Sequence, residues 1–120
     1  MLEWYKCKGD VWCDLFKVDL NHPAIKETNG VFIIWYGKDD TRRVLKVGQG
    51  NIYQELIKLQ NDLTFKAFSG HGVSVSWALV PPLKRPGVLV YLINSLSPAI
   101  LGDTPPRAIP IKENFPWDEL

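Results

Sequence analysis

A chain of 120 residues has the length of one domain, and a hydrophobic fraction of 46% provides enough apolar side chains for a packed core. This composition excludes a disordered chain, and the longest uninterrupted apolar runs, such as Val88 to Ile93, are far too short to span a membrane. The 14 Lys and Arg residues nearly balance the 13 Asp and Glu residues, so the chain lacks the overall basic excess of a dedicated nucleic-acid-binding protein.

The N-terminal region, residues 1–20, is expected to form a strand or hairpin. Residues 11–18 have the β-branched and aromatic content of a strand. The first residues lack the apolar core of a signal peptide, so we predict a cytoplasmic protein.

The chain has two cysteines, Cys7 and Cys13, within this region. A reducing compartment disfavours a disulfide between them, and we expect two partly buried thiols. His22 and His71 could complete a four-ligand zinc site with them. Because the spacing matches no common zinc motif, we predict no metal site from these residues.

Two strands are predicted in the first half of the chain. Residues 30–36 are continuously apolar and β-branched, which indicates a strand buried on both faces. A polar turn follows, and residues 43–47 return as an antiparallel partner. Gly48 and Gly50 are expected to break this second strand.

An amphipathic helix of about three turns is predicted next. Asn51 can cap its first turn, and apolar side chains recur with helical spacing at Ile52, Leu56 and Leu59. The polar pair at 61–62 marks its end.

The second half of the chain adds a strand, a second helix and an irregular tail. Residues 73–80 alternate, which predicts a strand with one solvated side. Residues 87–93 fit either a buried strand or a helix that is apolar all round, and Pro86 at a first-turn position favours the helix. The tail, 97–120, contains five prolines and is expected to wrap the domain as extended chain held by Phe115 and Trp117.

The order of these elements resembles the GIY-YIG nuclease domain over about residues 30–104. Residues 30–32, Gly-Val-Phe, are similar to the first tripeptide of that family, and residues 46–48, Lys-Val-Gly, to the second. Residues 48–52 resemble the opening of its first helix, and residues 91–98 a later helix. Asn114 to Trp117 also resemble a motif of small bacterial GIY-YIG-like proteins. These motifs are individually weak, but their order and spacing make the match more specific.

The resemblance implies a single domain over 1–120 with an α/β fold of the α+β type. A small central antiparallel sheet of three strands would be flanked by helices, with an additional N-terminal strand or hairpin. The hairpin would occupy residues 1–20, and the proline-rich wrap 97–120.

The resemblance also implies that the catalytic residues of the family are replaced. Phe32 stands where the first tripeptide carries a tyrosine, so that position has no hydroxyl for proton transfer. Lys46 replaces the second tyrosine, and Glu55 the arginine that stabilises charge. Leu89 occupies the position of the metal-binding glutamate, and a hard cation needs oxygen ligands. We therefore expect no efficient nuclease and no cofactor.

Three functional hypotheses follow. The first is a catalytically degraded domain that binds DNA or RNA weakly, or another protein. It uses the cations Arg43 and Lys46 beside Gln49 and Asn51, within a local basic cluster that also contains Lys38 and Arg42. Each of these side chains also has an ordinary explanation, because exposed cations solvate strands and Asn and Gln satisfy turns and caps.

The second hypothesis is an endonuclease with rearranged chemistry and a bound Mg²⁺ or Mn²⁺. Tyr36, Tyr53 or His71 would then supply a base and Glu55 a metal ligand. The third is a protein-interaction domain with no nucleic-acid role, for which the balanced charge and the aromatic residues near both ends provide support.

Overall fold

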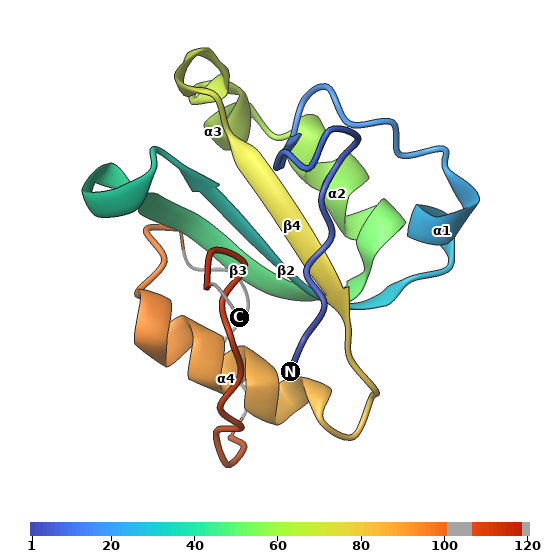
Figure 1. Ribbon diagram of the computed structural model, residues 1–120, viewed down its shortest axis with the longest axis vertical. Coiled ribbons are helices and arrows are strands. Elements are labelled where there is room, and N and C mark those ends of the chain that lie inside the picture. Colours follow the sequence, from blue (N-terminus) through green and yellow to red (C-terminus); the bar gives the residue numbers. More distant parts are fainter. Residues whose placement is uncertain (101–106, 119–120) are drawn as a thin grey trace.

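The computed structural model describes residues 1–100 and 107–118. Its centre is an antiparallel sheet of four strands with the order β1-β4-β2-β3 (Figure 1). The strands are β1 (Cys13–Asp14), β2 (Asn29–Tyr36), β3 (Arg43–Asn51) and β4 (Ser74–Leu79). This architecture confirms the predicted α+β fold, with β1 as the additional N-terminal strand.

Two longer helices cover opposite faces of the sheet (Figure 1). They are α2 (Ile52–Gln60) and α4 (Arg85–Leu96), and the short helices are α1 (Pro23–Lys26), α3 (Leu63–Lys66) and two single 3₁₀ turns, η1 (Asp39–Thr41) and η2 (Ser69–His71). Among residues 1–100 and 107–118, no helix is long and apolar enough to cross a membrane.

Strand β2 is the centre of both cores because its side chains alternate between the two helices. Phe32 and Ile34 pack toward α2, whereas Val31, Ile33 and Trp35 pack toward α4. All five side chains are at most 2% exposed, which confirms the prediction of burial on both faces. Helix α4 meets the second core as the predicted apolar helix, with Pro at its first turn.

The expected strand break at residues 48–50 is wrong, because β3 continues through both glycines to Asn51. Gly48 pairs with Phe32 and Gly50 with Gly30 in the ladder. A Cβ atom at Gly48 would lie 2.3 Å from Cζ of Phe32. The glycine therefore gives space to a neighbouring aromatic ring instead of ending the strand.

The predicted solvated side of β4 is also wrong. Ser76 is completely buried, and its hydroxyl donates a hydrogen bond of 2.7 Å to the carbonyl of Tyr5. Ser76 pairs with Ile33, so it faces the α4-side core, against which Trp4 and Trp12 of the N-terminal region also pack. The N-terminal segment thus covers the side of β4 that the alternating pattern assigns to solvent.

Only two of residues 11–18 form a strand, because Asp14 begins a turn. Its carbonyl accepts hydrogen bonds from the backbone N–H groups of Lys17 and Val18, and its carboxylate accepts one from Phe16 N–H at 2.8 Å. Side-chain capping of this kind competes with strand pairing. The prediction of a longer strand here is wrong.

The expectation of two free thiols is wrong as well, since Cys7 and Cys13 form a disulfide. The backbone N–H of Cys7 donates to the carbonyl of Val11 at 2.8 Å, and this tight turn brings the two cysteines together. Because the sulfurs are bonded to each other, neither is available as a thiolate to the zinc site considered with His22 and His71.

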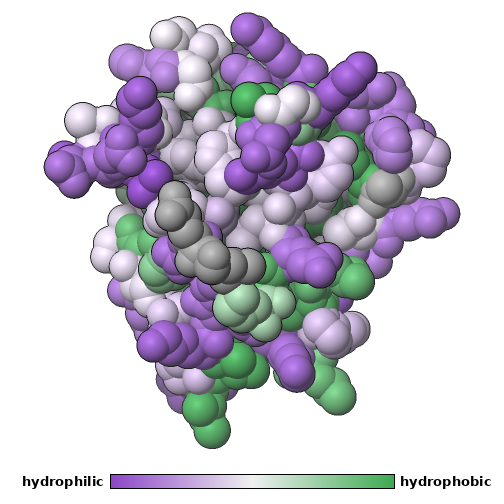
Figure 2. Space-filling model, viewed as in Figure 1, coloured by the Kyte–Doolittle hydropathy of each residue, from purple (hydrophilic) through white to green (hydrophobic). Residues whose placement is uncertain are grey.

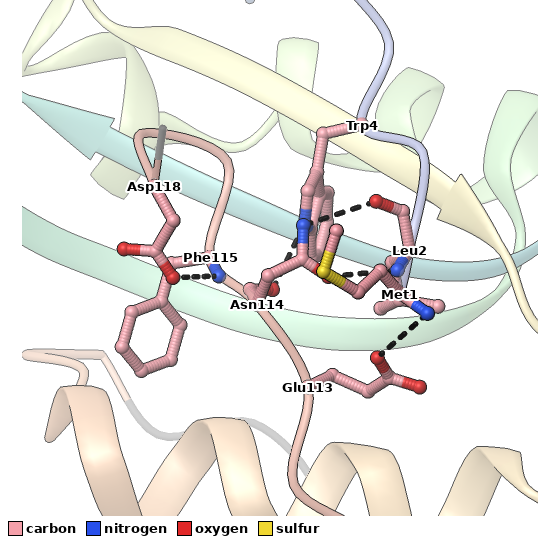
Figure 3. A network of polar contacts seen from close by, with 7 residues as sticks. All are labelled: Met1, Leu2, Trp4, Glu113, Asn114, Phe115 and Asp118. Carbon is pink, nitrogen blue, oxygen red and sulfur yellow. Dashed lines mark hydrogen bonds and ion pairs between the residues drawn. The ribbon is translucent and has the colours of Figure 1, made fainter. Parts of the chain in front are cut away.

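The C-terminal segment is held against the N-terminus by a network of polar contacts (Figure 3). The side-chain amide of Asn114 accepts from Leu2 N–H at 2.7 Å and donates to the Leu2 carbonyl at 3.0 Å. The indole N–H of Trp4 donates to the Asn114 carbonyl at 2.9 Å. The predicted anchoring by Phe115 and Trp117 is confirmed, because both pack against the α4-side core. Residues 101–106 and 119–120 of the predicted wrap lie outside the described residues.

Candidate functional site

Phe32, which the resemblance aligns with the first tyrosine of the GIY-YIG family, lies in the core. Phe32 is 1% exposed, and its ring lies over Gly48 on the α2 side of the sheet. The two tripeptides are therefore direct neighbours in the β2–β3 ladder. No hydroxyl projects from Phe32 toward solvent, so this position can supply packing but no proton transfer.

Glu55 lies in the first turn of α2, where the helix dipole stabilises a negatively charged side chain. Its carboxylate lies 3.5 Å from the ammonium group of Lys58, one turn along the helix, and close to Gly50 of β3. The side chain is partly exposed, so this pair contributes little to stability. Glu55 remains accessible to solvent, but Leu89 does not share its surroundings.

Leu89 lies on the opposite side of the sheet. It is 7% exposed and belongs to the core between α4 and the sheet, with Val31 and Ile33. The position expected for a metal-binding glutamate is thus inside an apolar cluster. Among residues 1–100 and 107–118, there is no group of three His, Cys, Asp or Glu side chains able to hold a metal ion.

The residues of the nuclease alternative are divided between the two ends of β2. Tyr36 is at the C-terminal end of β2, 5.6 Å from the His71 ring between centroids. Tyr53 is at the start of α2, beside the other end of β2, with the Lys26 ammonium over its ring at 5.1 Å. Glu55 shares the Tyr53 end, so a base from Tyr36 or His71 would not face it.

A β-bulge places the two predicted binding cations on one face of the sheet. Arg43 pairs with Tyr36 and Lys46 with Ile34, while Leu45 is the extra residue of the bulge. Because Tyr36 and Ile34 are two positions apart, their partners share the α2 face. In a regular strand, residues 43 and 46 would point to opposite faces.

Gln49 and Asn51 do not join these cations. Gln49 pairs with Val31, so it belongs to the α4 face. Asn51 is the N-cap of α2: its side-chain oxygen accepts from Gln54 N–H at 3.0 Å, and its amide nitrogen donates to the Lys26 carbonyl at 3.0 Å. The ordinary explanation therefore holds for Asn51, whose cap was predicted.

A pocket of about 500 Å³ opens where β2 turns into β3, at the C-terminal end of α4. We call it the edge pocket, and the side chains used below are Tyr36, Arg42, Arg43, Phe68, Ser97 and Trp117. It therefore contains one of the predicted binding residues, Arg43.

Aromatic rings form two walls of the edge pocket. On one side, Tyr36 stacks on Phe68 with 5.7 Å between centroids and 27° between planes. On the other side, Trp117 packs edge-on against Trp35 at 5.3 Å. Two sets of contacts position Trp117: the hydrogen bonds of Asn114 with the N-terminus, and a turn in which the Asp118 carboxylate accepts a hydrogen bond from Phe115 N–H (Figure 3).

Arg42 lies against the Trp117 wall, with its guanidinium carbon 4.1 Å from the ring centroid. Its Nε is buried, and it has no hydrogen-bond partner in the part of the chain that the structure describes. Arg43 is exposed beside it. The opposing charge in the lining is the exposed carboxylate of Asp39. The cluster of Arg residues is visible in the sequence, but Trp117 and Phe68 are not adjacent to it and carry no sequence signal of a pocket.

Comparison of the chain with protein-family models, with curated proteins and with solved structures finds no match. The resemblance to GIY-YIG nucleases therefore rests on the motifs and on the element order alone.

Proposed function

We propose that this chain is a degenerate relative of the GIY-YIG nucleases that binds DNA or RNA without cleaving it and without a metal. The observation that carries the proposal is the common face of Arg43 and Lys46, with the rings of Tyr36 and Phe68 lining the same pocket as Arg43. Cations that track phosphates, combined with aromatic rings that accept bases, are the usual elements of single-strand binding.

The loss of cleavage follows from the replaced positions. Phe32 is buried and has no hydroxyl, and Leu89 is packed in the apolar core on the other face. A phosphodiester bound near Arg43 and Lys46 would lack the hydroxyl that the first tripeptide supplies in the family and an oxygen cage for a cation. The rearranged-nuclease alternative could combine only Tyr53 with Glu55 at one end of β2, because Tyr36 and His71 lie at the other end.

The protein-interaction alternative draws on a different surface. Leu83 is 97% exposed and Ile109 is 87% exposed, and residues 109–111 lie beside Gly87 at the start of α4. Figure 2 shows apolar side chains gathered in the lower half of the view, around α4, and mostly hydrophilic ones above. The aromatic residues near the chain ends do not add to this surface, because Trp4, Phe115 and Trp117 pack on the core.

A salt titration of oligonucleotide binding tests the proposal. Labelled single-stranded DNA and RNA are titrated with the wild-type chain, with Arg43→Ala and Lys46→Ala, and with Lys84→Ala as an exposed control cation away from the site. Each lost phosphate contact should reduce the slope of log affinity against log salt by about 0.7. Lys84→Ala should keep the wild-type slope. An affinity that changes neither with salt nor in the Arg43→Ala and Lys46→Ala variants would instead favour apolar protein association.

A further inference from the structure

The edge pocket contains an arginine whose hydrogen bonding is incomplete. Arg42 Nε is buried and has no partner among residues 1–100 and 107–118. Buried polar groups are nearly always paired, and an orphan calls for an explanation such as a missing ion or ligand. The Trp117 ring, 4.1 Å from the guanidinium carbon, covers one flat side of the group. This stacking leaves the edge of the guanidinium, where its N–H donors lie, as the direction from which a ligand can bind.

The charges of the pocket restrict where an anion can sit. Arg42 and Arg43 lie next to each other in sequence and both line the pocket. The negative groups are Asp39 and the carbonyl end of α4, which finishes at Leu96 beside Ser97. An anionic group is therefore favoured at the arginine side and disfavoured at the α4 side. A phosphate suits two arginines because its oxygens accept several N–H bonds at once.

The remaining wall suits a flat ring. Tyr36 and Phe68 are stacked, both are half-buried, and both line the pocket with Arg43. The volume of the edge pocket, about 500 Å³, falls within the usual range for small-molecule sites. A ring can enter such a recess only when it is not already stacked and paired in a duplex.

We propose that the edge pocket binds one unpaired nucleotide, with its phosphate on Arg42 and Arg43 and its base against Tyr36 and Phe68. This inference rests on the proposed nucleic-acid function and assigns it to single strands. It also gives Arg42, which is not among the predicted binding residues, the central role.

The test compares a labelled oligothymidylate with a blunt-ended duplex at one low salt concentration, for wild type and three variants. Arg42→Lys keeps the charge but removes the Nε donor and the flat fork, and Phe68→Leu keeps an apolar side chain but removes the ring. Lys84→Gln is the control on the exposed loop before α4. Because loss of one base-stacking contact weakens single-strand binding about tenfold or more, Phe68→Leu should lose about that factor toward the single strand. Arg42→Lys should also weaken single-strand binding, because lysine lacks the Nε donor and the flat fork that match a phosphate. Neither variant should change duplex affinity.

Thymidine 5′-monophosphate, thymidine and inorganic phosphate, added as competitors, identify the bound unit. Displacement by the monophosphate, and not by either part alone, supports the inference for a free nucleotide as well as for a strand. Equal binding of single strand and duplex, still weakened by Arg43→Ala, would overturn the pocket assignment and leave the proposed function standing. Absence of binding to both nucleic acids would overturn both. Stronger competition by a phosphotyrosine peptide would also overturn it. Since Arg42→Lys could disturb folding, Phe68→Leu gives an independent result, and thermal unfolding of each variant checks its integrity.

Discussion

The guanidinium carbon of Arg42 lies 4.1 Å from the centre of the Trp117 ring, joining the β2–β3 turn to the C-terminal segment. Trp117 in turn meets Trp35 edge-on at 5.3 Å, and Trp35 meets Trp12 in the same way at 5.4 Å. A row of aromatic rings thus connects the N-terminal region with the wall of the edge pocket. Trp117 therefore belongs both to the packed core and to the wall of the proposed binding pocket.

Trp117→Ala should lower the free energy of unfolding by about 2 kcal/mol, below the 3–5 kcal/mol typical of a fully buried aromatic residue, because Trp117 is half-buried. Urea unfolding measures the change. Leu83→Ala, at a side chain that is 97% exposed, is the control and should stay within about 0.5 kcal/mol. Equal effects of the two substitutions would show that the C-terminal segment does not pack as described.

Asn114→Ala should destabilise the chain by about 1–3 kcal/mol, since it removes two hydrogen bonds and leaves the Leu2 backbone groups unpaired. Amide hydrogen exchange should also accelerate at Leu2. Asn94→Ala is the matched control, because Asn94 is exposed on α4. An Asn114 variant as stable as the Asn94 variant would contradict the role of the Asn114 hydrogen bonds in holding the C-terminal segment against the N-terminus.

Gly48→Ala should lower stability by about 1–3 kcal/mol, the usual effect of forcing an extra carbon into a packed core. The new Cβ would lie 2.3 Å from Cζ of Phe32, which is buried and cannot swing away. Gly70→Ala has nothing within 4 Å of its Cβ and serves as the control. Adding Phe32→Leu should recover part of the Gly48→Ala loss in a double-mutant cycle, and strict additivity would argue against the contact.

Loss of the disulfide should destabilise the chain by about 2 kcal/mol, the chain-entropy value for a loop as short as the one between Cys7 and Cys13. Thermal unfolding with and without dithiothreitol measures it. The double variant Cys7→Ser, Cys13→Ser should have a lower melting temperature than the wild type, and that temperature should not change when the reductant is added. A wild-type melting temperature that does not respond to the reductant would indicate free thiols.

The elements with one dominant local signal could be predicted from the sequence. Strand β2 is continuously β-branched, α2 has its Asn51 cap and apolar stripe, and α4 has a proline in its first turn. These features depend on near neighbours in the chain and on burial of a large apolar surface. They also place the two glycine tripeptides side by side.

The candidate site was harder to predict because it depends on long-range geometry. No local pattern marks Leu45 as a bulge, yet the bulge decides that Arg43 and Lys46 share a face. Similarly, the burial of Ser76 depends on the N-terminal segment around Tyr5, which is far away in the sequence. The Cys7–Cys13 bond depends on a tight turn rather than on the cysteine spacing.

The most direct test of the central claim, binding without cleavage, incubates labelled single- and double-stranded DNA and RNA with the chain and either Mg²⁺ or Mn²⁺. Binding is read from mobility shifts and cleavage from denaturing gels of the same samples. We predict salt-sensitive binding of single strands with every substrate intact. Cleavage that disappears in Glu55→Ala but persists in Glu27→Ala, an exposed carboxylate after α1, would contradict the account and make Glu55 a catalytic residue.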